Sequence, residues 1–219
     1  EQDGVQKDLP VAGLAIARAA ETPDVLPEVS AESFSQLVSA LYVAATDAEA
    51  WKDFLELLRV QIGGNYCSLI VRDTLGDHIG LVISAANTSK TLLEHDPYGY
   101  CSPLVGIPQN TVVTMAERLT EREWRSCRYY TDWCRHVDVF QVMALDIQIE
   151  DNCCYGLRAT RSEQMPPFGP REKTLMTLLI PHVRRALNLH LSLNRDRQLI
   201  SLYGRATAQL MVGVISSSS

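Results

Sequence analysis

The stretch FQVMALDIQIEDNCCYGLRATRS (140–162) decides the class of fold, because its hydrophobic residues recur at every second position. A period of two is typical of a β-strand with one face packed and the other partly exposed to water. Asp151 and Asn152 provide a turn inside the stretch, which predicts an antiparallel hairpin. The residues expected on the buried face are Met143, Leu145, Ile147 and Ile149. Those expected on the wetter face are Ala144, Asp146, Gln148 and Glu150.

Further hairpin, strand and helix signals lie on either side of this stretch. Alternating residues over 65–87 predict another hairpin with a turn at 75–77, and TVVTM (111–115) predicts a short strand. Apolar residues at helical spacing predict a pair of helices over 30–64 and a long helix from Pro170 onward. Hairpins between helices predict an α+β domain with an antiparallel sheet. We expect the terminal helices to cover one face of that sheet and the segment between the hairpins to cover the other.

The segment between the two hairpins spans about fifty residues, which is too long for a simple connection and is typical of a functional insertion. Its residues 117–136 predict one helix, with Thr120 and Glu123 as a capping box. Successive residues of a helix turn by about 100°, so we expect Trp124 and Tyr130 to lie on different faces.

Aromatic residues gather in and beside this segment. The chain has 3 Trp, 8 Tyr and 4 Phe residues, and nearly half of them fall between Tyr98 and Phe140. Tyr and Trp combine an apolar ring with a polar tip, which suits a pocket that encloses an organic ligand and fixes its orientation. Ordinary core packing of the rings is the alternative. The residues that we expect to bind the ligand are Tyr98, Tyr100, Trp124, Tyr130, Trp133, Phe140 and Met143.

Composition narrows the class of protein. The chain has 219 residues, of which 46% are hydrophobic, and a net charge of -6. Its sequence lacks the basic stripe of a free-standing nucleic-acid-binding domain, an apolar run long enough to span a membrane, and a secretory signal. The cysteines are irregularly spaced, which favours reduced thiols and a cytoplasmic protein. Cys153 and Cys154 are adjacent in a strand, where they are either a redox switch or two small apolar fillers.

Catalytic and metal-binding patterns give only weak candidates. The sequence contains no nucleophile-elbow, metalloprotease or phosphate-loop motif. His95 and Asp96 are either an acid–base pair or a simple polar pair in a loop. Cys127, Cys134 and His136 do not have the spacing of a zinc site. We therefore expect no enzyme activity, no metal and no cofactor.

Four stretches, in this order, resemble one regulatory domain. They are LVSALYVAATDAEAWKDFLELL (37–58), DPYGYCSPLV followed by NTVVT (96–114), EREWRSCRYYTDWCRHVDVF (121–140) and PFGPREKTLMTLLIPHVRRALNLH (167–190). Together they resemble the N-terminal sensor domain of bacterial LuxR-type helix-turn-helix transcriptional regulators. The resemblance implies a GAF/PAS-like antiparallel sheet flanked by helices, with a long C-terminal helix, and a small organic effector.

Two features depart from that family. Residues 200–215 are too short and too apolar for a helix-turn-helix, so we expect DNA binding only through a domain of a longer parent chain. Quorum-sensing members bind acyl-lactones with the help of an Asp in the stretch that YGYCSPLV resembles, and this chain has Ser102 there. The resemblance therefore does not extend to acyl-lactone specificity.

The long C-terminal helix is expected to do more than close the fold. Gly169 suits its N-cap, and Pro181 should kink it. Apolar residues continue along the helix past 186, where the sensor domain is expected to end. An uncovered apolar stripe usually meets its own copy, which predicts a parallel homodimer. The residues that we expect to form this dimer are Leu187, Leu191, Leu199 and Leu202.

The sequence thus predicts three parts. An N-terminal arm covers 1–30, a GAF/PAS-like sensor domain covers 31–186, and a signalling and dimerisation helix with the start of a further segment covers 187–215. The predicted function is a small-molecule-sensing regulatory domain of a transcriptional regulator, with the effector between the sheet and residues 98–140. The alternative is a ligand-free GAF-like module for dimerisation or protein interaction.

Overall fold

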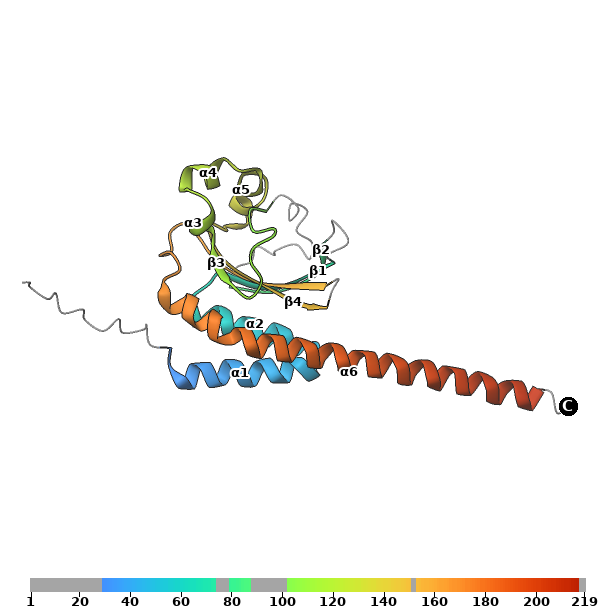
Figure 1. Cartoon of the computed structure of the whole chain (residues 1–219). Helices are drawn as coiled ribbons and strands as arrows, with labels where there is room; N and C mark the ends of the chain where they lie inside the picture. Colours follow the sequence, from blue (N-terminus) through green and yellow to red (C-terminus); the bar gives the residue numbers. More distant parts are fainter. Residues whose placement is uncertain (1–28, 74–78, 88–101, 151–152, 217–219) are drawn as a thin grey trace, which may run out of the picture.

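A computed structural model gives the arrangement of the chain (Figure 1). The described residues are 29–73, 79–87, 102–150 and 153–216, with the side chains of the last helix described as far as Asp196. Most of the expected N-terminal arm, both expected hairpin turns, and Tyr98 and Tyr100 lie outside these ranges. The elements are α1 (Ala31–Thr46), α2 (Ala50–Gln61), β1 (Tyr66–Asp73), β2 (Ile79–Ala86), β3 (Val112–Thr114), α3 (Met115–Arg118), α4 (Glu121–Ser126), α5 (Arg128–Asp132), η2 (Cys134–Val137), β4 (Gln141–Glu150), β5 (Cys153–Arg161) and α6 (Pro170–Ser216).

The strands form one five-stranded sheet in the order β2-β1-β5-β4-β3, and all neighbours are antiparallel. Leu157 of the central strand β5 lies opposite Leu69 of β1 and Leu145 of β4. Helices α1, α2 and α6 cover one face of the sheet, and α3, α4 and α5 lie over the other (Figure 1). This arrangement confirms the predicted α+β class and the predicted covering of the two faces.

The face of the sheet toward α1, α2 and α6 holds the main hydrophobic core. Met143, Leu145 and Ile147 of β4 are at most 1% exposed there, as the alternation predicts. Leu41 of α1 and Phe54 of α2 are fully buried in the same cluster. The pair of helices predicted over 30–64 is therefore confirmed.

Asp146 corrects the prediction that the opposite face of β4 is wet. It is only 3% exposed, whereas Gln148 is exposed as predicted. The strand register is the expected one, because Leu145 and Ile147 still face the helices. Residues 102–140, which we call the cap, lie over the face of the sheet that carries Asp146. The cap and this face together form a second hydrophobic cluster, and Asp146 is buried because the cap covers it.

The cap also corrects the prediction of one helix over 117–136. This part of the chain forms short elements from α3 to η2. A capping box starts α3 and another starts α4, and Cys127 between α4 and α5 is extended, with φ -76° and ψ 147°. Because the helix is interrupted at Cys127, the turn of about 100° per residue no longer determines how the Trp124 and Tyr130 side chains are oriented relative to each other. Their ring centroids lie 5.0 Å apart, so two side chains expected on different faces are in contact.

The last helix, α6, begins as predicted and continues through Pro181. Glu172 in its first turn accepts a hydrogen bond from Gly169 N at 2.8 Å. Leu187 is 2% exposed within the single chain, and Leu191 packs against the same core. Leu187 therefore has no surface left for a partner, which corrects its assignment to a dimer contact. Leu191 is only partly buried, so its assignment stays a prediction.

Helices α1 and α2 explain why the core extends further along α6 than expected. His190 of α6 lies against Trp51 of α2 with 6.0 Å between ring centroids. His182 lies edge-on to Phe34 and Tyr42 of α1, at 5.6 and 6.2 Å. Helices α1 and α2 thus cover a side of α6 that the sequence of α6 alone would leave exposed. Beyond these contacts α6 extends away from the rest of the domain (Figure 1).

Candidate functional site

The structure brings together four of the residues predicted to bind a ligand. Trp124 of α4, Tyr130 of α5 and Phe140 before β4 lie in one cluster on the cap side of the sheet. Trp133 is buried in the same cluster, at 9% exposed. Met143 packs among the helices on the other side of the sheet. It cannot line a cap-side pocket, so its assignment to the ligand site is corrected.

Ring contacts and a hydrogen bond hold the aromatic cluster together. The Tyr130 ring centroid lies 5.0 Å from that of Trp124 and 5.8 Å from that of Phe140. Trp124 Nε1 donates a hydrogen bond to the Phe140 carbonyl oxygen at 3.0 Å. The Arg125 guanidinium carbon lies 4.6 Å from the Phe140 ring centroid, within cation–π range. The cluster thus fixes α4 and α5 to the start of β4, and burial raises the pKa of Tyr130.

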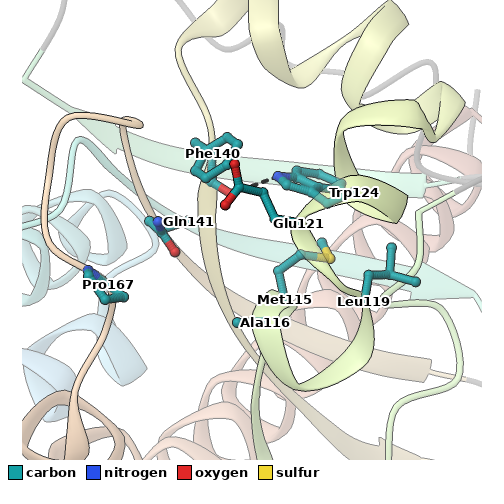
Figure 2. A pocket seen from close by; sticks show the side chains of 8 residues that line it. All are labelled: Met115, Ala116, Leu119, Glu121, Trp124, Phe140, Gln141 and Pro167. Atoms are coloured by element: carbon teal, nitrogen blue, oxygen red, sulfur yellow. Dashed lines mark hydrogen bonds between the residues drawn. The ribbon is translucent and has the colours of Figure 1, made fainter.

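A pocket of about 180 Å³ opens beside this cluster (Figure 2). Two predicted residues, Trp124 and Phe140, line it. The lining residues that sequence reasoning missed are Met115, Ala116, Leu119, Glu121, Gln141 and Pro167. The walls therefore come from α3, α4, the start of β4 and the loop before α6. The capping boxes in the sequence were a signal for α3 and α4, whereas Pro167 reaches the pocket only through the tertiary fold.

Two polar side chains line the pocket, Glu121 and Gln141, and only Glu121 has a hydrogen-bond partner among the described residues. Glu121 accepts a hydrogen bond from Arg125 Nε at 2.8 Å, and Arg125 also forms an ion pair with Glu163. The hydrogen bonds that Arg125 donates to Glu163 and Glu121 raise the pKa of Arg125, and the one to Glu163 lowers the pKa of Glu163. The carboxamide of Gln141, in contrast, makes no side-chain hydrogen bond with the described part of the chain.

A buried ion pair lies on the same face of the sheet. Arg158 Nη2 is 2.5 Å from Asp146 Oδ1, and Arg158 Nη1 donates to the Leu145 carbonyl at 2.9 Å. Gly156, opposite Asp146, leaves room for the guanidinium, since a Cβ there would meet Arg158 Nη1 at 2.9 Å. Asn110 N donates to the Asp146 carbonyl at 2.8 Å. The pair therefore lies where the cap is joined to β4, and its charges are paired rather than exposed to water.

An ion pair connects the pocket wall to the first turn of α6. Lys173 Nζ of α6 lies 2.5 Å from Glu117 Oε1 of α3. Glu117 also accepts a hydrogen bond from Thr114 N at 2.8 Å and so caps α3. The Lys173 hydrogen bond, followed by the one from Thr114, lowers the pKa of Glu117. One carboxylate thus serves both the start of α3 and its attachment to α6.

Arg161, at the end of β5, holds the loop that leads into α6. Its Nη1 donates to the carbonyls of Pro166 and Pro167 at 3.0 and 3.2 Å. Its Nη2 lies 3.5 Å from Glu172 Oε1, and its guanidinium carbon lies 4.4 Å from the Phe168 ring centroid. Since Pro167 also lines the pocket, Arg161 connects the pocket wall to the beginning of α6.

Comparison with known proteins supports the description of the fold. No protein-family model and no curated protein matches the sequence. The phycoerythrobilin-bound GAF domain from a cyanobacterial phytochrome superimposes with a TM-score of 0.56 and 13% identity, covering 76% of this chain and 99% of that chain. The fold is GAF-like.

Other GAF-like structures agree with this description. The phycocyanobilin-bound GAF domain from a cyanobacterial phytochrome gives a TM-score of 0.54 and 10% identity, covering 76% of this chain and 98% of that chain. The VqsR LBD domain from Pseudomonas aeruginosa gives a TM-score of 0.50 and 13% identity, covering 74% of this chain and 95% of that chain. At these identities the likeness is one of fold.

The described part of this GAF-like domain holds no metal cluster. No three His, Cys, Asp or Glu side chains within the described ranges lie close enough together to hold a metal ion. Cys67, Cys127, Cys134 and Cys154 are thiols rather than disulfides. Burial raises the pKa of Cys67, which keeps that thiol protonated and unreactive. None of the helices in these ranges combines the length and hydropathy needed to cross a membrane.

Proposed function

We propose that this GAF-like domain is the small-molecule sensor of a transcriptional regulator, with an organic effector in the pocket beside Trp124 and Phe140. The main support is that the pocket has walls from the cap and from the loop that leads into α6. An effector there would touch both Trp124 of the cap and Pro167 of that loop. Its presence would therefore change how α6 leaves the domain.

The contacts around the pocket supply a route for that change. A ligand shifts a conformational equilibrium only through contacts that differ between the two states. An effector that moves α3 relative to the loop alters the distance between Glu117 and Lys173, which is 2.5 Å without it. It also alters the position of Pro167, whose carbonyl Arg161 holds. Both changes act on the first turn of α6.

The similar structures support a binding role for this fold. Two of them are bilin-bound GAF domains, and the VqsR LBD domain is of the LuxR type. The pocket of about 180 Å³ is smaller than the roughly 300–1,000 Å³ of sites for drug-sized ligands, so the proposed effector is smaller than a bilin. The proposal includes no catalytic step, because no Ser, Cys, His or Lys lines the pocket.

The proposed output is a parallel homodimer formed by the part of α6 beyond Leu191. That part extends away from the domain (Figure 1) and contains Leu199 and Leu202. Burying one leucine contributes roughly 1.5–3 kcal/mol, so a few such residues on each of two helices would favour association. A dimer of this kind places the two C-termini together, where following DNA-binding domains would act as a pair.

A ligand-free dimerisation module is the second candidate. It is favoured by the filling of the space between cap and sheet, where Leu104, Val139 and Trp133 are all buried. Native mass spectrometry of the chain purified from its own host distinguishes the two functions. A retained small molecule on the dimer is the result expected for a sensor. A dimer without any added mass after gentle isolation would favour the ligand-free module.

A further inference from the structure

The size of the pocket limits how much of an effector it encloses. Its volume is about 180 Å³. An apolar protein cavity of about 150 Å³ is large enough to take up benzene. One aromatic ring with a single small substituent therefore fits, whereas a fused ring system or a long chain would project into water.

The walls of the pocket favour a ring over a polar ligand. Met115 and Trp124 are each 3% exposed, and Leu119 and Phe140 pack against the same cluster. Aromatic rings pack favourably edge-to-face on other rings and beside a thioether sulfur. A saturated polar molecule would lose its hydration here without comparable contacts.

The charges beside the pocket disfavour an ionised effector. Arg125 is held by both Glu121 and Glu163, and Lys173 is held by Glu117. An anion would approach these carboxylates without finding an unpaired cation among them. A cation would have to replace Arg125 at Glu121. An uncharged molecule disturbs neither pair.

One polar group at the pocket remains to be matched. The Gln141 carboxamide lines the pocket and makes no side-chain hydrogen bond with described residues. A carboxamide carries one acceptor and two donors, so another amide satisfies it in both directions at once. We infer that the effector of the proposed sensor is a small uncharged aromatic ring bearing an amide group that pairs with Gln141. The inference rests on the proposed function and specifies the chemical class that the pocket selects.

Four single-ring probes test this chemistry on the wild-type chain. Benzamide, benzoate, benzylamine and toluene share one shape and differ in charge and hydrogen bonding. Binding is followed by NMR at the Trp124 indole N–H and the Gln141 side-chain amide. We expect benzamide to bind most tightly, toluene more weakly, and the two ions least of all.

Variants then test the role of Gln141. Gln141→Met keeps the length of the side chain and removes both hydrogen bonds of the amide pair. It should weaken benzamide binding by at least about tenfold, while leaving toluene binding unchanged. Gln164→Met is the matched control, because Gln164 is exposed and does not line the pocket. Equal weakening of both probes by Gln141→Met would show that the amide is not recognised.

The remaining outcomes separate this inference from the proposed function. Tighter binding of benzoate or benzylamine than of benzamide to wild type overturns the chemical class and leaves the pocket in place. Shifts confined to sheet residues such as Ser68 and Ala85 overturn the pocket as the binding site. If none of the four probes shifts any signal, the inferred class is wrong, and native mass spectrometry alone then decides whether the chain is a sensor.

Discussion

Lys173 and Glu117 form an ion pair across 56 residues of sequence, with 2.5 Å between Nζ and Oε1. Glu117 lies on α3 beside two residues of the pocket wall, Met115 and Ala116. Lys173 lies in the first turn of α6. The pair therefore connects α3, which forms part of the pocket wall, to the proposed output helix.

Lys173→Met should reduce the dependence of stability on pH. The pKa of Glu117 is lowered from its ordinary 4.5 in the folded chain. The stability that the ionised Glu117 contributes is therefore fully present above pH 4.5 and is lost as the pH falls through the pKa of the folded chain. With the Lys173 side chain 34% and the Glu117 side chain 49% exposed, the pair contributes about 0–1 kcal/mol. Urea unfolding at pH 7 and pH 3 should differ less for this variant than for wild type.

The control for that experiment is Lys52→Met, which removes an exposed lysine from α2. It should leave the difference between the two pH values as in wild type. An equal change in both variants would mean that overall charge, and not the pair with Glu117, sets the dependence.

Leu187→Ala should destabilise the folded chain at every protein concentration. Leu187 is 2% exposed in the core, and truncating a buried leucine costs about 2–5 kcal/mol. Leu189, at 40% exposed, is the matched control, and Leu189→Ala should cost no more than about 0.5 kcal/mol. Denaturant unfolding measures both. A stability loss for Leu187→Ala that disappears on dilution would instead place this residue in a dimer contact.

Asp146→Leu and Arg158→Met should each cost about 3–5 kcal/mol, because each leaves a buried group of opposite charge without its partner. The double variant should recover most of that loss, since it removes both charges. Unfolding free energies of the four proteins in this cycle give the coupling. Gln148→Leu, an exposed position on the same face of β4, is the control and should have little effect. Additive losses in the double variant would contradict a direct pair.

Trp124→Phe and Trp133→Phe should separate ligand binding from cap packing. Trp124 lines the pocket and Trp133 does not, so only the first change should weaken binding of the effector. The expected loss is about tenfold, because the change removes ring area from the pocket wall and the hydrogen bond that holds Trp124 to the Phe140 carbonyl. Isothermal titration calorimetry with the molecule recovered from the purified protein measures this. A larger loss from Trp133→Phe would move the site deeper beneath the cap.

The parts of the fold that follow from local periodicity were predictable from the sequence. Met143, Leu145 and Ile147 face the helices because alternation alone determines which side of a strand is apolar. Burial of Asp146 was not predictable in this way, because it depends on Arg158 in the next strand and on a cap that covers both.

The site shows the same division between local and tertiary causes. The clustering of aromatic residues pointed to Trp124 and Phe140, but the extended backbone at Cys127 was needed to bring Tyr130 onto Trp124. Pro167 joins the pocket only because β5 returns the chain to the start of β4, a relationship that spacing along the sequence does not contain.

The most direct test of the account asks whether an effector occupies the pocket between α3, α4 and the loop before α6. Ala116 lines that pocket and is exposed, so Ala116→Phe should fill it without disturbing the core. Ala48→Phe, at an exposed position that does not line the pocket, is the matched control. In native mass spectra of the three proteins purified from the host of origin, we predict a retained small molecule on wild type and Ala48→Phe and none on Ala116→Phe. Retention of the same molecule by Ala116→Phe, or its absence from all three proteins, would contradict the account.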